Sequence, residues 1–350
     1  MTCVHWTCTT ITLFHVTLAA SAQTFVEADP LFQDDQPLEI TITAPLTALM
    51  RERPDEDYLT GHIRYTGSHG NTVDFDVGIR TRGKYRRQSK ICPFPPLRLN
   101  FRSSQTKGTL FHKQDKLKLV THCRNKRTRY NQGVIREYLA YRILNILTDV
   151  SYRVRLLHVT YVDSDNKLSK FQRYAFVIEH KDRLTRRTEF SQVNVERTQV
   201  KKLQPDHTNL VSVFHFMIGN SDFSPIAGVA GETCCHNHSL FGREGELYFS
   251  IPYDFDMAGI VDAPYAVPDP SLRLRNVRQR LYRGRCKNNE QLPASLKTFQ
   301  DNRDEIFSFL DTQAELTPAI RKKVVLYIEK FYAIIDNPKL VERNLIKKCI

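Results

Sequence analysis

Four polar residues between positions 222 and 256 have side chains that could hold a metal ion and a phosphate. Asp222 lies in a short segment with apolar residues on both sides, Asn237 follows two adjacent cysteines, and Asp254 and Asp256 come shortly after a proline. Carboxylate and amide oxygens are hard donors that suit magnesium or manganese. Transfer of a phosphoryl group uses one carboxylate to orient the incoming hydroxyl, while another carboxylate and an amide oxygen hold the ions that bridge the phosphates.

Each of these residues also has a structural interpretation. An Asp after Gly-Asn-Ser, such as Asp222, is often a turn or helix-cap residue, and Asn237 taken alone is more often structural. Asp254 and Asp256 alternate on an expected strand, so their carboxylates should point the same way. Two like charges on one face repel unless a cation or hydrogen-bond donors satisfy them. This repulsion favours a metal role for at least one of the pair.

The same stretch contains four zinc-type ligands within five residues: Cys234, Cys235, His236 and His238. Zinc sites usually separate paired ligands by two to five residues, and adjacent cysteines do not easily chelate one tetrahedral ion. A cysteine nucleophile with a histidine base is a further alternative. The partners of such a pair meet in space rather than in sequence, so the adjacent histidine adds little support.

Hydrophobic periodicity predicts the elements that must position these residues. Alternating runs predict antiparallel strands over 37–45, around a turn at 68–71, and over 95–101, 115–123, 153–163 and 170–180. Helical spacing predicts helices over 131–147, 209–220, 293–313 and 316–337, and short strands are expected around 239–242, 246–250 and 251–256. The sequence therefore predicts an α+β protein with a strand-rich N-terminal lobe (23–205) and a helical C-terminal lobe (206–350), and a ligand site between them.

Composition and charge narrow the classes of partner. The 350 residues are 41% hydrophobic and 25% charged, which is ordinary for a globular protein. A formal net charge of +13 suits phosphate-bearing ligands, nucleic acid or an anionic membrane. Because no zinc-finger or RNP signature accompanies the charge, nucleic acid is not the expected partner. No apolar run reaches the length of a membrane span, and the oligomeric state is not predicted.

The N-terminus and the cysteines indicate export. Residues 1–22 combine a short apolar stretch with a small-residue cleavage pattern, which predicts a signal peptide and a periplasmic or secreted protein. Six of the eight cysteines would remain after cleavage, an even number that suggests disulfides. We expect Cys92 to pair with Cys123 and Cys286 with Cys349. Adjacent cysteines rarely bond each other, so Cys234 and Cys235 are expected to pair elsewhere or to stay reduced.

The order Asp, Asn, Asp is also the order in protein kinases. Together with the segments "RGKYRR", "PPLRLNF", "VIREYLAYRILNIL" and "YAFVIEH", the stretch "SDF…CCHNHSLF…IPYDFD" resembles the CotH-like atypical protein kinases. The resemblance covers roughly residues 79–260. It implies a two-lobed protein-kinase-like fold, ATP with magnesium or manganese as cofactors, and a protein substrate.

The resemblance also implies roles for individual residues. Asp222 would be the catalytic Asp, Asn237 a metal ligand, and Asp254 or Asp256 the second metal ligand. Glu179 would lie in the hinge between the lobes, near the adenine. By position, Glu137 on the first long helix would pair with the cation that grips the phosphates. The candidates for that cation are Lys118 and Arg98, the only cation that "PPLRLNF" offers where the family has a lysine-rich strand.

These observations leave three hypotheses. The first is an exported kinase that transfers phosphate from ATP to protein hydroxyls, which the Asp, Asn, Asp set favours. The second is a catalytically inactive kinase-fold binding or structural protein of the cell envelope, which the missing strand lysine favours. The third is a nucleotidyltransferase, since the same fold can perform that reaction when it binds the phosphates of the nucleotide differently. In the first and third cases turnover should depend on a divalent ion.

Overall fold

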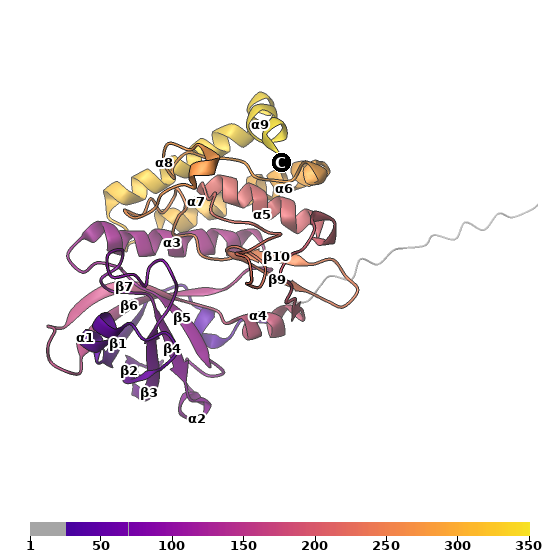
Figure 1. The fold of residues 1–350 in the computed structure, drawn as a ribbon. Helices are drawn as coiled ribbons and strands as arrows, with labels where there is room; N and C mark the ends of the chain where they lie inside the picture. Colours follow the sequence, from indigo (N-terminus) through magenta and orange to yellow (C-terminus); the bar gives the residue numbers. More distant parts are fainter. Residues whose placement is uncertain (1–25, 69) are drawn as a thin grey trace, which may run out of the picture.

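Seven strands close into a mixed β-barrel in the N-terminal half of the chain (Figure 1). The computed structural model describes residues 26–68 and 70–350. The barrel strands are β1 (Leu38–Ala44), β2 (Leu59–Thr66), β3 (Thr72–Thr81), β4 (Leu97–Phe101), β5 (Lys116–Val120), β6 (Val154–Asp163) and β7 (Phe171–Ile178). Their order around the barrel is β1-β2-β3-β4-β5-β7-β6. The neighbours pair antiparallel except β1 and β6, which pair in parallel with Leu38 opposite Leu157.

The barrel follows from the alternation in the sequence. In β1 the side chains of Ile40, Ile42 and Ala44 are buried, while the residues between them are partly exposed. The same alternation continues through β2 to β5, because successive side chains of a strand point to opposite faces of a sheet. The inward residues form one apolar core inside the barrel. The expected strand-rich N-terminal part is therefore confirmed.

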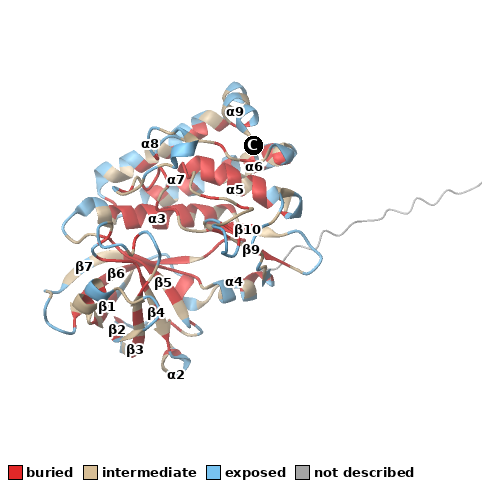
Figure 2. Ribbon diagram, viewed as in Figure 1, coloured by how far each residue is buried: buried red, intermediate tan, exposed pale blue. Residues whose placement is uncertain are grey.

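Helix α3 (Thr128–Leu147) connects β5 to β6 in the chain and lies between the barrel and the C-terminal helices. It packs against β6 and β7 on one side and against α7 on the other. Thirteen of its twenty residues are buried, and Figure 2 shows it as a mostly buried rod between the barrel and the helices above it. A helix enclosed on several sides places its polar residues, such as Glu137, where they need partners.

The C-terminal region is mainly helical and carries a small second sheet. Its helices are α5 (Pro205–Ile218), α6 (Leu292–Asp301), α7 (Arg303–Asp311), α8 (Pro318–Ile335) and α9 (Pro338–Asn344). Three short helices lie earlier in the chain: α1 (Leu46–Glu52), α2 (Ser103–Thr106) and α4 (Lys181–Thr188). The sheet has the order β10-β9-β8, from β8 (Ser191–Gln192), β9 (His238–Gly242) and β10 (Phe249–Pro252). Because β8 pairs with β9, segments on both sides of the expected boundary at residue 205 share this sheet.

Two expected elements differ from the structure. The helix expected over 293–313 is two helices, because the backbone of Asn302 leaves the helical region between α6 and α7. The strands expected over 246–250 and 251–256 are one strand, β10, which ends at Pro252. Proline cannot donate to a strand ladder. Asp254 and Asp256 therefore lie after the strand and not on it, which corrects the expected alternation.

Three disulfides connect the described cysteines. Cys92 pairs with Cys123 and Cys286 with Cys349, as expected. The third bond joins Cys234 to Cys235, so the expectation that these neighbours do not bond each other is wrong. Structural disulfides are typical of proteins in oxidising compartments, which agrees with an extracellular location. The expected signal peptide lies outside the described residues, and none of the described helices is long and apolar enough to span a bilayer.

Candidate functional site

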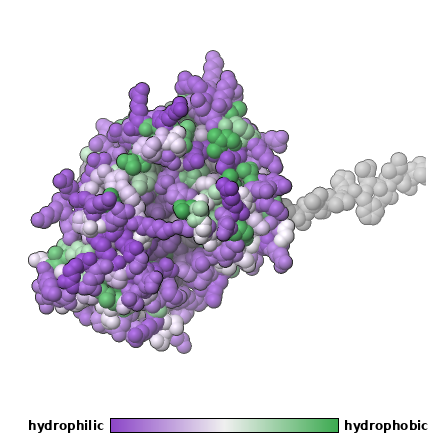
Figure 3. All heavy atoms as spheres, viewed as in Figure 1, coloured by the Kyte–Doolittle hydropathy of each residue, from purple (hydrophilic) through white to green (hydrophobic). Residues whose placement is uncertain are grey.

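The four polar residues between positions 222 and 256 line one cavity. Its volume is about 360 Å³, and Asp222, Asn237, Asp254 and Asp256 all contribute to its wall. The opposite wall is the basic loop 82–86, which follows β3 of the barrel. The cavity, visible as a hollow in the space-filling view of Figure 3, therefore lies where the barrel faces the C-terminal region, as expected.

Asp222 lies four residues after the end of α5 and makes direct contacts with Asn237 at the far end of the same connection, just before β9. The amide nitrogen of Asn237 donates to the Asp222 carbonyl oxygen (2.7 Å) and to its carboxylate Oδ2 (3.0 Å). His236 Nε2 lies 2.7 Å from Asp222 Oδ1. This hydrogen bond, with the charge of Asp222, raises the pKa of His236. The Asp222 side chain is still 40% exposed, so it is accessible from the cavity.

A buried chain of hydrogen bonds fixes the backbone of Asp222. The Asp222 N–H donates to Asn220 Oδ1 (3.0 Å), so the Asn220 amide nitrogen is the donor to His215 Nδ1 (3.2 Å). His215 must then carry its proton on Nε2, which donates to Nε2 of His238 (2.9 Å). His238 in turn carries its proton on Nδ1 and donates to Ser250 Oγ (2.9 Å). Burial lowers the pKa of both histidines, so both are neutral at pH 7.

Asp254 and Asp256 are placed by aromatic packing. Asp254 has a left-handed backbone (φ 63°), and its N–H donates to the Tyr141 hydroxyl of α3 (2.8 Å). Phe255 between them is fully buried and packs on Tyr141. Asp256 is buried beside Arg86, whose Nη1 lies 3.7 Å from Asp256 Oδ2. Burial, reinforced by the charge of Asp254, raises the pKa of Asp256 to about 7.

The cation that pairs with Glu137 is Arg86, whereas Lys118 or Arg98 was expected. Arg86 Nη1 lies 3.5 Å from Glu137 Oε2, and Arg86 Nη2 donates to the Thr121 carbonyl (2.8 Å). Arg86 and Glu137 are both buried. Burial raises the pKa of Glu137 well above its usual value, and the Arg86 charge opposes this shift. Arg86 thus links the barrel, α3 and the Asp256 segment.

Lys118 and Arg98 are neighbours across β4 and β5. Lys118 Nζ lies over the Tyr253 ring, 4.5 Å from its centre. Burial and the nearby charge of Arg82 lower the pKa of Lys118 to about 7, and Asp254 opposes the shift. Lys118 is therefore close to the Asp254 segment, although it does not pair with Glu137. Within the described chain, Arg98 makes no ion pair, and its buried Nε has no hydrogen-bond partner.

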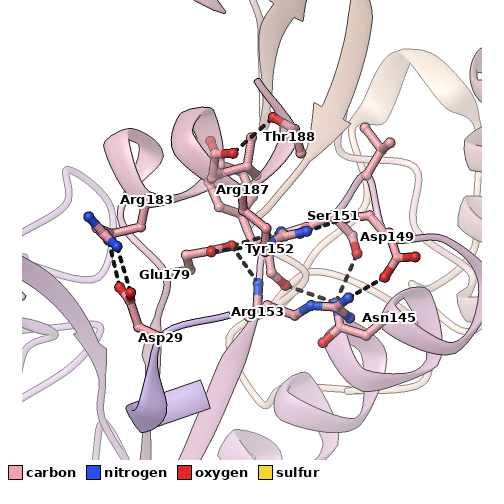
Figure 4. A network of polar contacts seen from close by, with 12 residues as sticks. Asp29, Asn145, Asp149, Ser151, Tyr152, Arg153, Glu179, Arg183, Arg187 and Thr188 are labelled. Carbon is pink, nitrogen blue, oxygen red and sulfur yellow. Dashed lines mark hydrogen bonds and ion pairs between the residues drawn. The ribbon is translucent and has the colours of Figure 1, made fainter. Parts of the chain in front are cut away.

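Glu179 follows β7 at the connection between the barrel and α4, and it is not among the residues that line the cavity. Figure 4 shows it facing Arg187, with which it forms an ion pair at 3.0 Å. It also accepts a hydrogen bond from the Arg153 N–H (3.1 Å). The side chain is buried, so these contacts use both carboxylate oxygens and stabilise the connection. Its predicted place near an adenine ring stays a prediction.

The donor set fits magnesium or manganese better than zinc. Throughout 26–68 and 70–350, no three His, Cys, Asp or Glu side chains are grouped closely enough to hold a metal alone. Magnesium is usually held by one or two carboxylates together with substrate phosphates and water, so Asp254, Asp256 and the Asn237 amide oxygen suit it. The Cys234–Cys235 bond removes both thiols from zinc binding and from nucleophilic attack.

Sequence reasoning missed Arg82, Arg86 and Tyr141 as site residues, and it named His236 as a zinc-type ligand or base but not as a partner of Asp222. The segment "RGKYRR" contributes to the resemblance, but nothing in its sequence distinguishes Arg86 from its neighbours. The comparison with known proteins adds no further assignment, since neither the protein-family models nor the curated proteins include a match to this chain.

Proposed function

We propose that this protein is an exported, two-lobed kinase-like enzyme that transfers phosphate from ATP to protein hydroxyls. One observation carries the proposal. Asp222 and Asn237 lie near the two ends of the connection between α5 and β9, Asp254 and Asp256 follow β10, and all four line one cavity with the basic loop 82–86. Structural roles for the two segments alone would not require their polar side chains to share a cavity with this loop.

The residues divide the chemistry between them. Asp222 is exposed to the cavity and orients the incoming hydroxyl, while His236 and Asn237 fix its carboxylate.

Asn237, Asp254 and Asp256 would hold magnesium or manganese, which neutralises the charge on the phosphates. Arg82 lines the cavity and supplies positive charge for the phosphates, and Lys84, which pairs with Glu232 of the same lining, can exchange that partner for a phosphate. Arg86 is held by Glu137 and keeps the Asp256 segment in place.

Incubation with labelled ATP and manganese tests the reaction. The purified protein should label itself or an added protein from ATP labelled at the γ-phosphate, and Asp222→Asn should reduce labelling by about 10²- to 10⁴-fold. Label entering only from the α-phosphate would replace the kinase with a nucleotidyltransferase. No labelling from either position would contradict both enzymes.

Melting experiments test the binding site separately from turnover. At magnesium-ATP a hundredfold above its dissociation constant, linkage should add about 2.7 kcal/mol of stability. Asp254→Ala and Asp256→Ala should reduce this gain, because each removes an oxygen ligand. Identical melting with and without magnesium-ATP would support an inactive scaffold. A gain that persists unchanged in both variants would mean that the nucleotide binds elsewhere.

A further inference from the structure

A second cavity lies between α3, α8 and the segment that follows Asp256. Its volume is about 300 Å³, and it shares no lining residue with the candidate active site. Gly259 and Ile260 form one wall, Arg136 of α3 forms another, and α8 contributes Lys323 and Lys330. This cavity plays no part in the function proposed above, and a ligand bound in it would not depend on that function.

The lining of this cavity is strongly positive. Four cationic side chains contribute to it, and the single acidic side chain is Asp262. Asp262 already binds Arg129, whose Nη2 lies 3.3 Å from Asp262 Oδ2. The four cations are Arg136, Arg278, Lys323 and Lys330, and none forms an ion pair within the part of the chain that the structure describes. Like charges at close range repel, so such a cluster is stabilised by an anion.

Arg136 is the residue that distinguishes this cluster from a solvated basic surface. Its side chain is buried, yet its hydrogen bonds are two long contacts, from Nε to the Gln132 carbonyl (3.4 Å) and from Nη1 to the Ile260 carbonyl (3.5 Å). Its Nη2 has no hydrogen bond among the described residues. Burial lowers the pKa of Arg136 to about 10, so the guanidinium is still charged at pH 7. The charge of Asp262 opposes this shift, although Asp262 forms its ion pair with Arg129 and not with Arg136. A buried charge without a direct partner is costly.

We infer that this cavity binds a phosphate group, with the free edge of the Arg136 guanidinium as its central donor and Lys323 and Lys330 as flanking cations. A guanidinium presents a planar pair of donors that matches two phosphate oxygens. A dianion also balances more of the excess positive charge than a carboxylate does. The phosphate can be free in solution or belong to a phosphorylated side chain, since both present the same oxygens.

Calorimetric titration tests the inference. Inorganic phosphate is titrated into the full-length protein at constant ionic strength, with chloride as the reference anion. The double variant Lys323→Ala/Lys330→Ala should weaken phosphate binding by about tenfold or more, because it removes two charge-assisted contacts. The control is Lys322→Ala/Lys339→Ala, which removes the same charge from exposed positions outside the cavity. The control should bind phosphate as the parent protein does.

Arg136→Gln gives a second test at the central donor. Arg136→Gln should abolish phosphate binding. If this variant does not fold, the double variant Lys323→Ala/Lys330→Ala still tests the inference. Equal phosphate affinity in the two double variants would overturn the inference, as would heats no larger than those of chloride. A blocked phosphoserine distinguishes the sources of the ligand: tighter binding than inorganic phosphate supports a phosphorylated side chain, and equal binding supports free phosphate.

Discussion

Arg86 holds two buried carboxylates, Glu137 and Asp256, within 4 Å of one guanidinium nitrogen. Replacing it by methionine should lower the free energy of unfolding by about 3–5 kcal/mol, because breaking a buried ion pair leaves an uncompensated charge. Chemical denaturation at pH 7 measures the change.

The neighbouring Arg87 provides the matched control. It pairs with the half-exposed Asp55, so Arg87→Met should cost no more than about 1 kcal/mol. In the double variant Arg86→Met/Glu137→Leu, part of the lost stability should return, because one of the two buried carboxylates is removed together with the cation. Equal effects of Arg86→Met and Arg87→Met would contradict the central role of Arg86.

The hydrogen-bond chain behind Asp222 predicts the protonation of two histidines. His215 should carry its proton on Nε2 and His238 on Nδ1, because each remaining nitrogen accepts a hydrogen bond. Nitrogen-15 NMR of the histidine rings at pH 7 distinguishes these tautomers. The opposite tautomer at either ring would show that the chain is connected differently.

The consequence of this chain for turnover is a separate expectation. Asn220→Ala removes the acceptor of the Asp222 N–H but no cavity side chain. If Asp222 orients the hydroxyl, phosphoryl transfer should fall by about tenfold or more through misplacement, while the stability gain with magnesium-ATP persists. Loss of the stability gain with unchanged folding would assign Asn220 to nucleotide binding instead.

The sequence predicted which polar residues meet but not all of their partners. Asp222, Asn237, Asp254 and Asp256 were identified by residue type and chain order, and they share one cavity. Arg86 could not be identified in the same way, because "RGKYRR" offers four cations of equal local character. Only the tertiary position of Glu137 and Asp256 determines which of the four is buried.

At the scale of elements, Gly219 determines how α5 ends and where the Asp222 loop begins. Its backbone is left-handed (φ 68°), and a Cβ there would lie 2.0 Å from the Tyr327 hydroxyl of α8. Gly219→Ala should therefore lower the free energy of unfolding by more than about 2 kcal/mol, from backbone strain and the clash together. Thermal or chemical unfolding measures the loss.

Two variants separate the clash from the strain. Gly108 has a similar backbone (φ 74°), and a Cβ there would have nothing within 4 Å, so Gly108→Ala should cost the strain alone, about 1 kcal/mol. Adding Tyr327→Phe to Gly219→Ala removes the clashing oxygen and should recover part of the loss. No recovery would mean that strain, and not the contact with α8, sets the cost.

The elements themselves were largely predictable because their patterns are local. The alternation in β1 to β5 and the helical spacing of 131–147 appear in the structure within a few residues. The end of β10 at Pro252 was missed, since "IPYDFD" alternates like a strand and only the packing of Phe255 against Tyr141 shows otherwise. The hydrophobic pattern also could not predict that β1 and β6 close the barrel, because the register between distant strands is not a local property.

At the scale of the whole molecule, four buried histidines should make stability depend on pH. Burial lowers the pKa of His122 and His238 to about 3 and of His207 to about 4, and it lowers that of His215 as well. The unfolded chain binds protons at these sites below about pH 6.5 and the folded protein does not, so stability is lost as the pH falls from 6.5 towards 4. The raised pKa values of Glu137 and Asp256 act in the opposite direction and reduce the slope.

His207→Gln isolates one site of this set. His207 packs edge-on against Phe249, outside the candidate active site. Between pH 6.5 and 5, the parent should lose about 1.6 kcal/mol more than the variant, because the unfolded chain goes from about half a proton to nearly a full proton at this site over that interval. Parallel stability curves for the parent and the variant would show that His207 takes up its proton in the folded state.

Closure of the barrel also constrains the time course of folding as the chain is synthesised. Leu38 of β1 pairs with Leu157 of β6, so 119 residues separate the two strands that complete the ring. A ribosome adding about 5–20 residues per second needs several seconds to deliver the second strand after the first. During that interval β1 can pair with β2, while its other edge has no partner. An unpaired edge attracts other strands, so this nascent segment is where a holding chaperone would be needed.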